Sequence, residues 1–273
     1  MRILSHVHIY YKEMWPELQK CLTNVMKNNQ CDLYVTMVEK HEDLITDIKS
    51  FYPDTNIEII ENKGFDVAPF IHIINKVDLN NYDLVVKLHT KRNIDAKSFF
   101  INGFNVGADK WRKYLLNFCR TSKNWNASLK LLERDDVSCV SDYHIILNQD
   151  DNVSDDYIDN LEKKLDITYS RERKFVAGTM FVTKAYVFKS LQNKLKFDEF
   201  GPSARNNGDY LPYACERIFG FINDKKIVSY DGKNGKIEKI LSLLSSFVYR
   251  HKINDTKESI KILGIPVYKK KIK

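Results

Sequence analysis

A cluster of basic side chains follows an apolar run in the first half of the chain. The run covers residues 82–88 (YDLVVKL), and His89, Thr90, Lys91 and Arg92 come directly after it. Such a run is typical of a buried strand, and ligands of α/β sheets bind outside the carboxyl ends of the strands. Cationic side chains there can bind a diphosphate and stabilise charge on a leaving group. We therefore expect His89, Lys91 and Arg92 to bind phosphates; the alternative is a solvated basic surface.

A polar, glycine-containing turn follows an earlier apolar run, at residues 57–60. It contains Asn62, Gly64 and Asp66. Glycine permits a positive φ or the close approach of a ligand, and the Asp66 carboxylate can accept hydrogen bonds from ribose hydroxyls or a base. These three residues are expected to bind the nucleoside of the same ligand. The alternative is an ordinary turn in which Asp66 caps the next helix.

Two carboxylates in the segment GDYLPYACERIFGFI are candidates for a general base. If residues 209–219 are helical, Asp209 and Glu216 lie two turns apart on one face. Asp209 is the preferred base for an acceptor hydroxyl and Glu216 is the second candidate. Arg217 would contact a phosphate or hold Glu216. The alternative is that Asp209 only stabilises the start of the helix, where a carboxylate is favourable.

Alternating strand and helix patterns surround these residues. β-Branched and aromatic runs predict strands, and apolar residues three or four positions apart predict amphipathic helices. Their alternation with short connections indicates an α/β protein with a parallel, doubly wound sheet. The predicted strands are 3–11, 32–38, 57–60, 84–88, 137–140 and 175–183; the predicted helices are 15–28, 41–50, 67–74, 126–132, 185–192 and 209–219, with 95–132 mostly helical and 148–166 a solvated acidic helix.

Composition is that of a folded globular protein. Hydrophobic residues make up 43% and aromatic residues 12% of the 273 residues, more than is typical of a disordered chain. The five cysteines are scattered and no secretion signal or membrane span is recognisable, so a reduced, cytosolic setting is expected. Histidine spacings do not match zinc motifs, and no G-x-G-x-x-G or Walker A loop is present. A zinc site, a dinucleotide oxidoreductase and a P-loop NTPase are therefore disfavoured.

Positive charge is concentrated at the end of the chain. Residues 233–273 contain eleven lysines and arginines against three acidic residues, a net charge of +8, which leaves −1 of the total +7 for residues 1–232. Residues 237–248 have the apolar periodicity of an amphipathic helix, and the end is lysine-rich. We expect residues 237–273 to bind an anionic membrane surface, or else to dock on the body. A neutral body does not indicate nucleic-acid binding.

Four segments together resemble the rhamnan synthesis protein F family of bacterial polysaccharide glycosyltransferases. They are NKGFDVAPF (62–70), KLHTKR (87–92), AGTMF (177–181) and ACERIFG (214–220), and the resemblance extends from about Ile3 to Ile222. It implies a cytoplasmic enzyme, peripheral to the inner face of the membrane, that acts in capsule or O-antigen synthesis. The enzyme would transfer rhamnose or galactofuranose from a UDP- or dTDP-linked donor to a lipid-linked glycan. The family pattern has a histidine shortly before the ACER stretch, and this chain has Tyr213 there instead. The difference affects what the resemblance implies about acceptor binding.

The resemblance also implies a GT-A-like, mostly parallel sheet flanked by helices, to which the periodicity of the tail adds a basic helical extension at the C-terminus. Many GT-A enzymes carry Asp-x-Asp after a strand such as YDLVVKL, where the acids hold a metal ion. At this position the chain has Lys91 and Arg92, so we expect metal-independent transfer without a cofactor. The resemblance and the candidate base together imply inversion. The expected parts are a catalytic domain, 1–232, divided near residue 94 into nucleotide-binding and acceptor parts, and the tail 233–273. The alternative function is a non-catalytic scaffold in a polysaccharide assembly complex.

Overall fold

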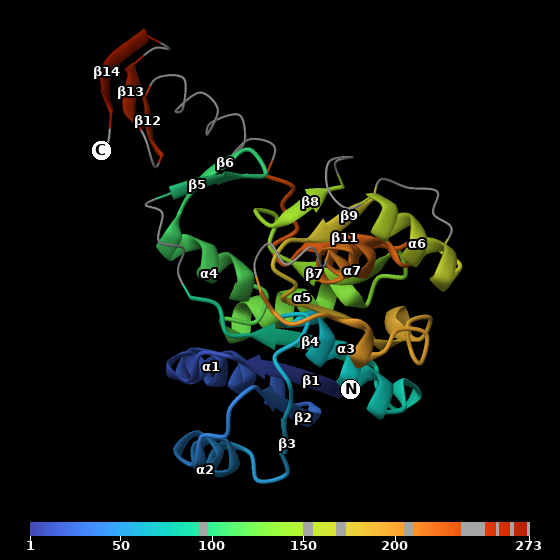
Figure 1. Cartoon of the computed structure of the whole chain (residues 1–273). Helices are drawn as coiled ribbons and strands as arrows, with labels where there is room; N and C mark the ends of the chain where they lie inside the picture. Colours follow the sequence, from blue (N-terminus) through green and yellow to red (C-terminus); the bar gives the residue numbers. More distant parts are fainter. Residues whose placement is uncertain are drawn as a thin grey trace.

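A seven-stranded mixed sheet forms the centre of the protein, in the order β11-β7-β10-β4-β1-β2-β3 (Figure 1). The computed structural model describes residues 1–92, 98–149, 155–167, 173–204, 210–235, 249–254, 257–262 and 265–271. The strands of the central sheet are β1 (Arg2–Ile9), β2 (Gln30–Met37), β3 (Asn56–Ile59), β4 (Leu84–His89), β7 (Val137–Ser141), β10 (Phe181–Lys184) and β11 (Lys226–Ser229).

All strands of this sheet except β10 run in the same direction. β1 pairs in parallel with β2 and β4, β2 with β3, and β7 with β11, whereas β10 is antiparallel to both β4 and β7. The chain builds the sheet outward from β1 to β3 and then returns to place β4 on the other side of β1. The predicted α/β fold with a mostly parallel sheet is thus confirmed. The order reverses at β1 and β4, the position where α/β sheets bind ligands.

Helices cover the sheet because their apolar residues recur at helical spacing. In α1, the buried residues Trp15, Leu18, Leu22 and Val25 form one stripe. α3 is buried nearly all round, and its Phe70 ring lies 4.9 Å from Phe188. The helices are α1 (Trp15–Met26), α2 (Glu42–Phe51), α3 (Val67–Lys76), α4 (Ala108–Leu116), α5 (Ser122–Leu132), α6 (Asp155–Leu165) and α7 (Leu211–Phe221), with 3-10 turns η1 (Lys12–Met14), η2 (Leu79–Asn81), η3 (Ala185–Phe188) and η4 (Phe197–Glu199).

The expectation that residues 95–132 are mostly helical is wrong at the start of this segment. β5 (Ser98–Ile101) and β6 (Phe104–Gly107) form a hairpin before α4. Its two-residue turn is Asn102–Gly103, and both residues have positive φ, 50° and 82°. An Asn-Gly pair between apolar residues favours this turn, because both types tolerate the left-handed conformation that matches the strand twist.

Two further elements differ from the sequence prediction. The expected strand at 175–183 is divided by a turn at Gly178 into β9 (Lys174–Val176) and β10, and β9 pairs with β8 (Ile146–Asn148) in a small separate sheet. The expected helix at 185–192 is only the 3-10 turn η3. The division of the strand matters for function, because the turn points its backbone groups toward β4 and α7, as described below.

The described residues of the C-terminal segment form three strands. β12 (Tyr249–Asn254), β13 (Lys257–Ile262) and β14 (Ile265–Lys271) form an antiparallel sheet that shares no strand with the central one (Figure 1). The predicted amphipathic helix at 237–248 lies outside the described residues, so a helical extension is not confirmed. None of the helices in the described part of the chain has the length and apolarity needed to cross a membrane.

Candidate functional site

Four polar side chains lie on one face of the two central strands. They are His6 and His8 of β1 and Lys87 and His89 of β4, and all four are buried. Side chains two positions apart on a strand point to the same face. The parallel register places His6 level with Lys87 and His8 level with His89. A row of titratable groups therefore runs toward the carboxyl ends of β1 and β4.

Asp66, immediately before α3, pairs with the buried Lys87. Lys87 Nζ donates to Asp66 Oδ2 at 2.5 Å and lies 5.5 Å from the centre of the Phe70 ring. The Asp66 side chain is 17% exposed, whereas that of Lys87 is fully enclosed. The Asp66 side chain makes no capping hydrogen bond to α3. The capping interpretation of Asp66 is therefore wrong, and its carboxylate pairs with Lys87 of β4 instead.

The turn at Gly178 and Thr179 joins this pair to the rest of the site. Lys87 Nζ also donates to the Thr179 carbonyl oxygen at 3.2 Å and to its hydroxyl oxygen at 2.8 Å. The Thr179 hydroxyl donates in turn to Asp66 Oδ2. His89 Nε2 lies 2.7 Å from the Gly178 carbonyl oxygen and Nδ1 lies 3.1 Å from that of Thr90, so the shorter contact favours a ring proton on Nε2. The AGTMF segment thus provides acceptors for both polar residues of β4.

Gly178 is required by geometry. Gly178 and Thr179 have positive φ values of 79° and 50°. A Cβ atom on Gly178 would lie 2.6 Å from Leu115 Cδ2, so a larger residue would force the leucine side chain or the turn to move, besides straining a backbone of positive φ. This close approach lets the Gly178 N–H donate to Glu216 Oε1 of α7 at 2.5 Å. Asp66, β4, the turn and α7 therefore form one hydrogen-bonded network, which we call the Thr179 network.

Glu216 and Arg217 lie side by side on α7. Arg217 Nη1 is 3.3 Å from Glu216 Oε2 and donates to the Tyr213 carbonyl oxygen at 2.9 Å, and its guanidinium lies over the Phe175 ring. Burial raises the pKa of Glu216, against the opposing effects of the Gly178 N–H and Arg217. Of the two roles expected for Arg217, the structure contains the contact with Glu216.

Burial and charge set the protonation of the network. Burial raises the pKa of Asp66, but His89 and Lys87, with the hydrogen bonds from Lys87 and Thr179, outweigh burial and hold the pKa well below its usual range. Burial lowers the pKa of His89 to about 4 and that of His8 to about 3, which leaves both rings neutral at pH 7. Burial also lowers the pKa of Lys87, although the charge of Asp66 and its hydrogen bond act to raise this pKa. At neutral pH the site therefore holds a carboxylate among neutral imidazoles.

The two basic residues that follow β4 have different surroundings. Arg92 Nη2 donates to Glu13 at 2.8 Å, and the guanidinium lies 4.1 Å from the Tyr11 ring centre, away from Asp66. Lys91 is exposed, and its charge lowers the pKa of Glu216. The Thr90 hydroxyl accepts the backbone N–H groups of Tyr10 and Tyr11, which fixes the ends of β4 and β1 together.

The turn at Asn62 and Gly64 has a structural explanation. The Asn62 carbonyl oxygen accepts the Ser203 N–H, and the Gly64 N–H donates to the Gly201 carbonyl oxygen. Gly64 has a φ of 56°, and a Cβ atom there would lie 2.7 Å from both Ala68 and Phe200. Close packing, more than ligand approach, therefore requires glycine here. Asp209, the preferred base, lies outside the described residues.

Sequence reasoning missed several members of the site. Lys87 and Thr179 are central to the network, and His6 and His8 complete the polar face. A usable signal was present in the strands, because His6 with His8 and Lys87 with His89 are polar pairs at the two-residue period of a strand. A lysine inside an apolar strand predicts a buried partner of opposite charge.

The fold and this network define a doubly wound α/β protein with its polar site where the strand order reverses. The chain belongs to the rhamnan synthesis protein F family, whose sequence model matches residues 1–227. A comparison with curated proteins finds no match. All four segments that carry the resemblance lie within the matched residues. Membership indicates a part in rhamnan polysaccharide synthesis and supports a glycosyltransferase in general terms, with a sugar donor and a glycan acceptor.

The Lys87–Asp66 pair predicts a strong energetic coupling. Lys87→Met would leave the Asp66 carboxylate buried without its cation and lower the free energy of unfolding by about 3–5 kcal/mol. Adding Asp66→Asn removes that unpaired charge, so the double variant should be more stable than the sum of the single effects predicts, by about 1–3 kcal/mol. Urea denaturation of the four proteins measures this coupling.

An exposed ion pair provides the control for this cycle. Lys76 Nζ lies 2.9 Å from Glu58 Oε1 with the lysine side chain 53% exposed. Lys76→Met should cost less than about 1 kcal/mol, because exposed pairs contribute little. Strictly additive effects of Lys87→Met and Asp66→Asn would contradict the network.

Proposed function

We propose that the protein is a glycosyltransferase that moves rhamnose or galactofuranose from a UDP- or dTDP-linked donor to a lipid-linked glycan. Family membership supports the general class. The observation that carries the proposal is that the four family-like segments meet in one network, the Thr179 network, beside the carboxyl ends of β1 and β4. A GT-A-like assignment is supported by the mixed sheet, in which one antiparallel strand lies among parallel ones.

The donor diphosphate would bind beside Lys91. Lys91 is exposed at the end of β4 and close enough to Glu216, His89 and Lys87 to influence their pKa values. The positive charge of Arg92 is partly compensated by Glu13, so Arg92 is the weaker candidate. A lysine can supply the charge that a metal ion supplies in other transferases. We therefore keep metal-independent transfer as part of the proposal.

The two carboxylates would have different roles. Both Glu216 oxygens are engaged, one by the Gly178 N–H and one by Arg217, so Glu216 is suited to position the turn. Asp209 remains the proposed base that deprotonates the acceptor hydroxyl, which would give inversion at the anomeric carbon. It precedes the first residue of α7 by two positions. The nucleoside would lie near Asp66, within the first part of the catalytic domain.

Nucleotide binding tests the donor site. UDP or dTDP should raise the melting temperature of the protein, and EDTA should leave this shift unchanged. Lys91→Ala should weaken nucleotide binding about 10- to 100-fold, since a charge-assisted hydrogen bond contributes about 1.5–3 kcal/mol. Titration calorimetry measures the affinity.

Lys20, an exposed lysine of α1, provides the matched control, and Lys20→Ala should bind nucleotide as the unsubstituted protein does. Loss of the shift in EDTA would contradict metal independence. Absence of a shift with every nucleotide would favour the alternative function, a non-catalytic scaffold in an assembly complex.

The base assignment predicts a separation of binding from turnover. Asp209→Asn should lower the rate of nucleotide release from the donor by about 10²- to 10⁴-fold while leaving donor affinity unchanged, because only the proton acceptor is lost. Asp47→Asn, at an exposed carboxylate of α2, is the control. Full activity of Asp209→Asn would exclude Asp209 from this role.

The tail would attach the enzyme to the inner face of the cell membrane. Val267 and Tyr268 of β14 are exposed, and the sequence continues with three lysines, 269–271, a combination of apolar and cationic residues that favours a membrane surface. The full chain should sediment with phosphatidylglycerol vesicles at low salt, and a chain lacking residues 237–273 should remain in the supernatant. A truncated chain that still sediments would show that residues 1–236 bind the membrane instead.

A further inference from the structure

Four aromatic rings form a continuous row on the surface beside the site. The Phe65 ring centre lies 6.0 Å from that of Tyr213, Tyr213 lies 6.4 Å from Tyr210, and Tyr210 lies 6.0 Å from Tyr157. Adjacent rings are tilted by 48° to 61° and are not stacked face to face. The four rings therefore follow one another along the surface in tilted and edge-to-face contacts. We call these four residues the aromatic row.

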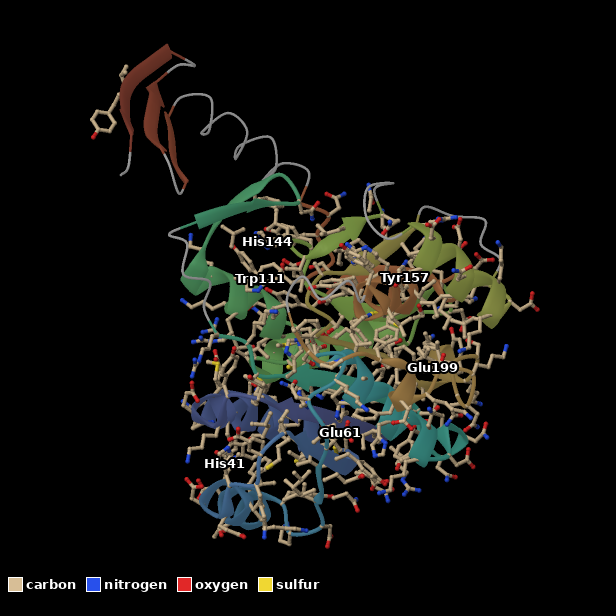
Figure 2. All side chains as sticks on the ribbon, viewed as in Figure 1. His41, Glu61, Trp111, His144, Tyr157 and Glu199 are labelled. Atoms are coloured by element: carbon tan, nitrogen blue, oxygen red, sulfur yellow. The ribbon has the colours of Figure 1, made fainter. Side chains whose placement is uncertain are left out.

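The three tyrosines of the row are exposed. Tyr157, Tyr210 and Tyr213 have 37%, 44% and 38% of their surface accessible. The row crosses three elements: Phe65 precedes α3, Tyr210 and Tyr213 are at the start of α7, and Tyr157 belongs to α6. α6 packs against α7, with Tyr157 labelled in this part of Figure 2. Contiguous exposed aromatic residues on a folded protein typically mark a binding surface.

One end of the row begins at the Thr179 network. Phe65 is the neighbour of Asp66, and the Phe65 N–H donates to Ser203 Oγ at 2.8 Å, which fixes the start of the row. The Tyr213 carbonyl oxygen accepts from Arg217, which contacts Glu216. The other end, Tyr157, lies on α6, outside the network. A ligand on the row would therefore extend from the proposed reaction site outward.

The chemistry of the row fits a neutral sugar chain. Tyrosine offers an apolar ring face and a hydroxyl that donates and accepts hydrogen bonds, which matches the C–H face and the hydroxyls of a sugar ring. A 6-deoxy sugar such as rhamnose adds a methyl group for the same apolar contact. Asp156 and Asp159, close to Tyr157 in the sequence of α6, are exposed and make this helix surface unfavourable for a phosphate. A nucleic acid or an anionic lipid headgroup is therefore a poor fit.

We propose that the aromatic row binds the growing glycan, with successive sugars of the acceptor against Tyr213, Tyr210 and Tyr157. This inference rests on the proposed function, because it assigns the acceptor side of the same site. The end of the glycan that receives the new sugar lies nearest Tyr213, next to Arg217 and Glu216 and toward Lys91, where the donor diphosphate would bind. The earlier sugars lie along α7 and α6. The row thus provides affinity for long acceptors over short ones.

Binding of rhamnan oligosaccharides of graded length tests the proposal. The full chain should bind long oligosaccharides more tightly than short ones in titration calorimetry. Tyr210→Ala should weaken binding of long and intermediate oligosaccharides about three- to tenfold, the loss of one aromatic contact. Tyr157→Ala should weaken binding only of the longest ones. UDP or dTDP should stabilise each variant as it stabilises the unsubstituted protein.

Tyr186 provides the matched control. It is 44% exposed, on η3, and is not a member of the row. Tyr186→Ala should leave oligosaccharide binding unchanged, and equal weakening by Tyr186→Ala and Tyr210→Ala would overturn the proposal. Loss of nucleotide binding in Tyr210→Ala, with oligosaccharide binding intact, would make the row a nucleobase platform and also overturn it.

The same titrations separate this inference from the proposed function. Nucleotide stabilisation without oligosaccharide binding at any length would overturn the aromatic row and leave the transferase proposal standing. Length-dependent oligosaccharide binding that Tyr157→Ala and Tyr210→Ala weaken, without stabilisation by any nucleotide, would support the row on a protein that does not use a nucleotide donor.

Discussion

The buried ion pair between Lys87 and Asp66 is the interaction on which the site depends. A lysine enclosed in a central strand loses its hydration, and that cost is offset only when all of its donors find acceptors. Lys87 has three N–H groups, and the Asp66 carboxylate, the Thr179 carbonyl and the Thr179 hydroxyl accept them. The two hydrogen bonds from Lys87 therefore fix the position of the turn at Thr179. Because the cost of desolvation offsets much of the attraction, the pair adds little net stability. Its main effect is to fix the position of its partners.

Everything around the pair is positioned through that turn. Gly178 reaches His89 on one side and Glu216 on the other, so β4 and α7 are held at a fixed separation. Lys87, Asp66 and Thr179 satisfy one another, whereas Lys91 is exposed at the strand end. A buried hydrogen-bonded network thus supports a surface that carries exposed polar and aromatic side chains. This is the arrangement that precise placement of reacting groups requires.

Sequence patterns predicted the first half of the fold well, because β1 to β4 and their helices are specified by local periodicity. The hairpin at Asn102 and Gly103 was missed because its aromatic strands were interpreted as helix, although the Asn-Gly turn was visible. Asp66 was identified as a site residue, but its partners were not, since Thr179 lies 92 positions from Lys87 and only the fold brings them together. At Gly64 the need for glycine was predicted correctly, and the proximity of Phe200 that explains it depends on tertiary packing.

The central claim is that the carboxyl ends of β1 and β4, above the Thr179 network, bind a nucleotide-sugar donor. A crystal structure of the protein with UDP or dTDP bound tests it most directly. The account predicts the diphosphate within hydrogen-bonding distance of Lys91 and the nucleoside on the side of Asp66, with the Lys87–Asp66 pair intact. A nucleotide bound elsewhere on the protein, with no contact to the end of β4, would contradict the account.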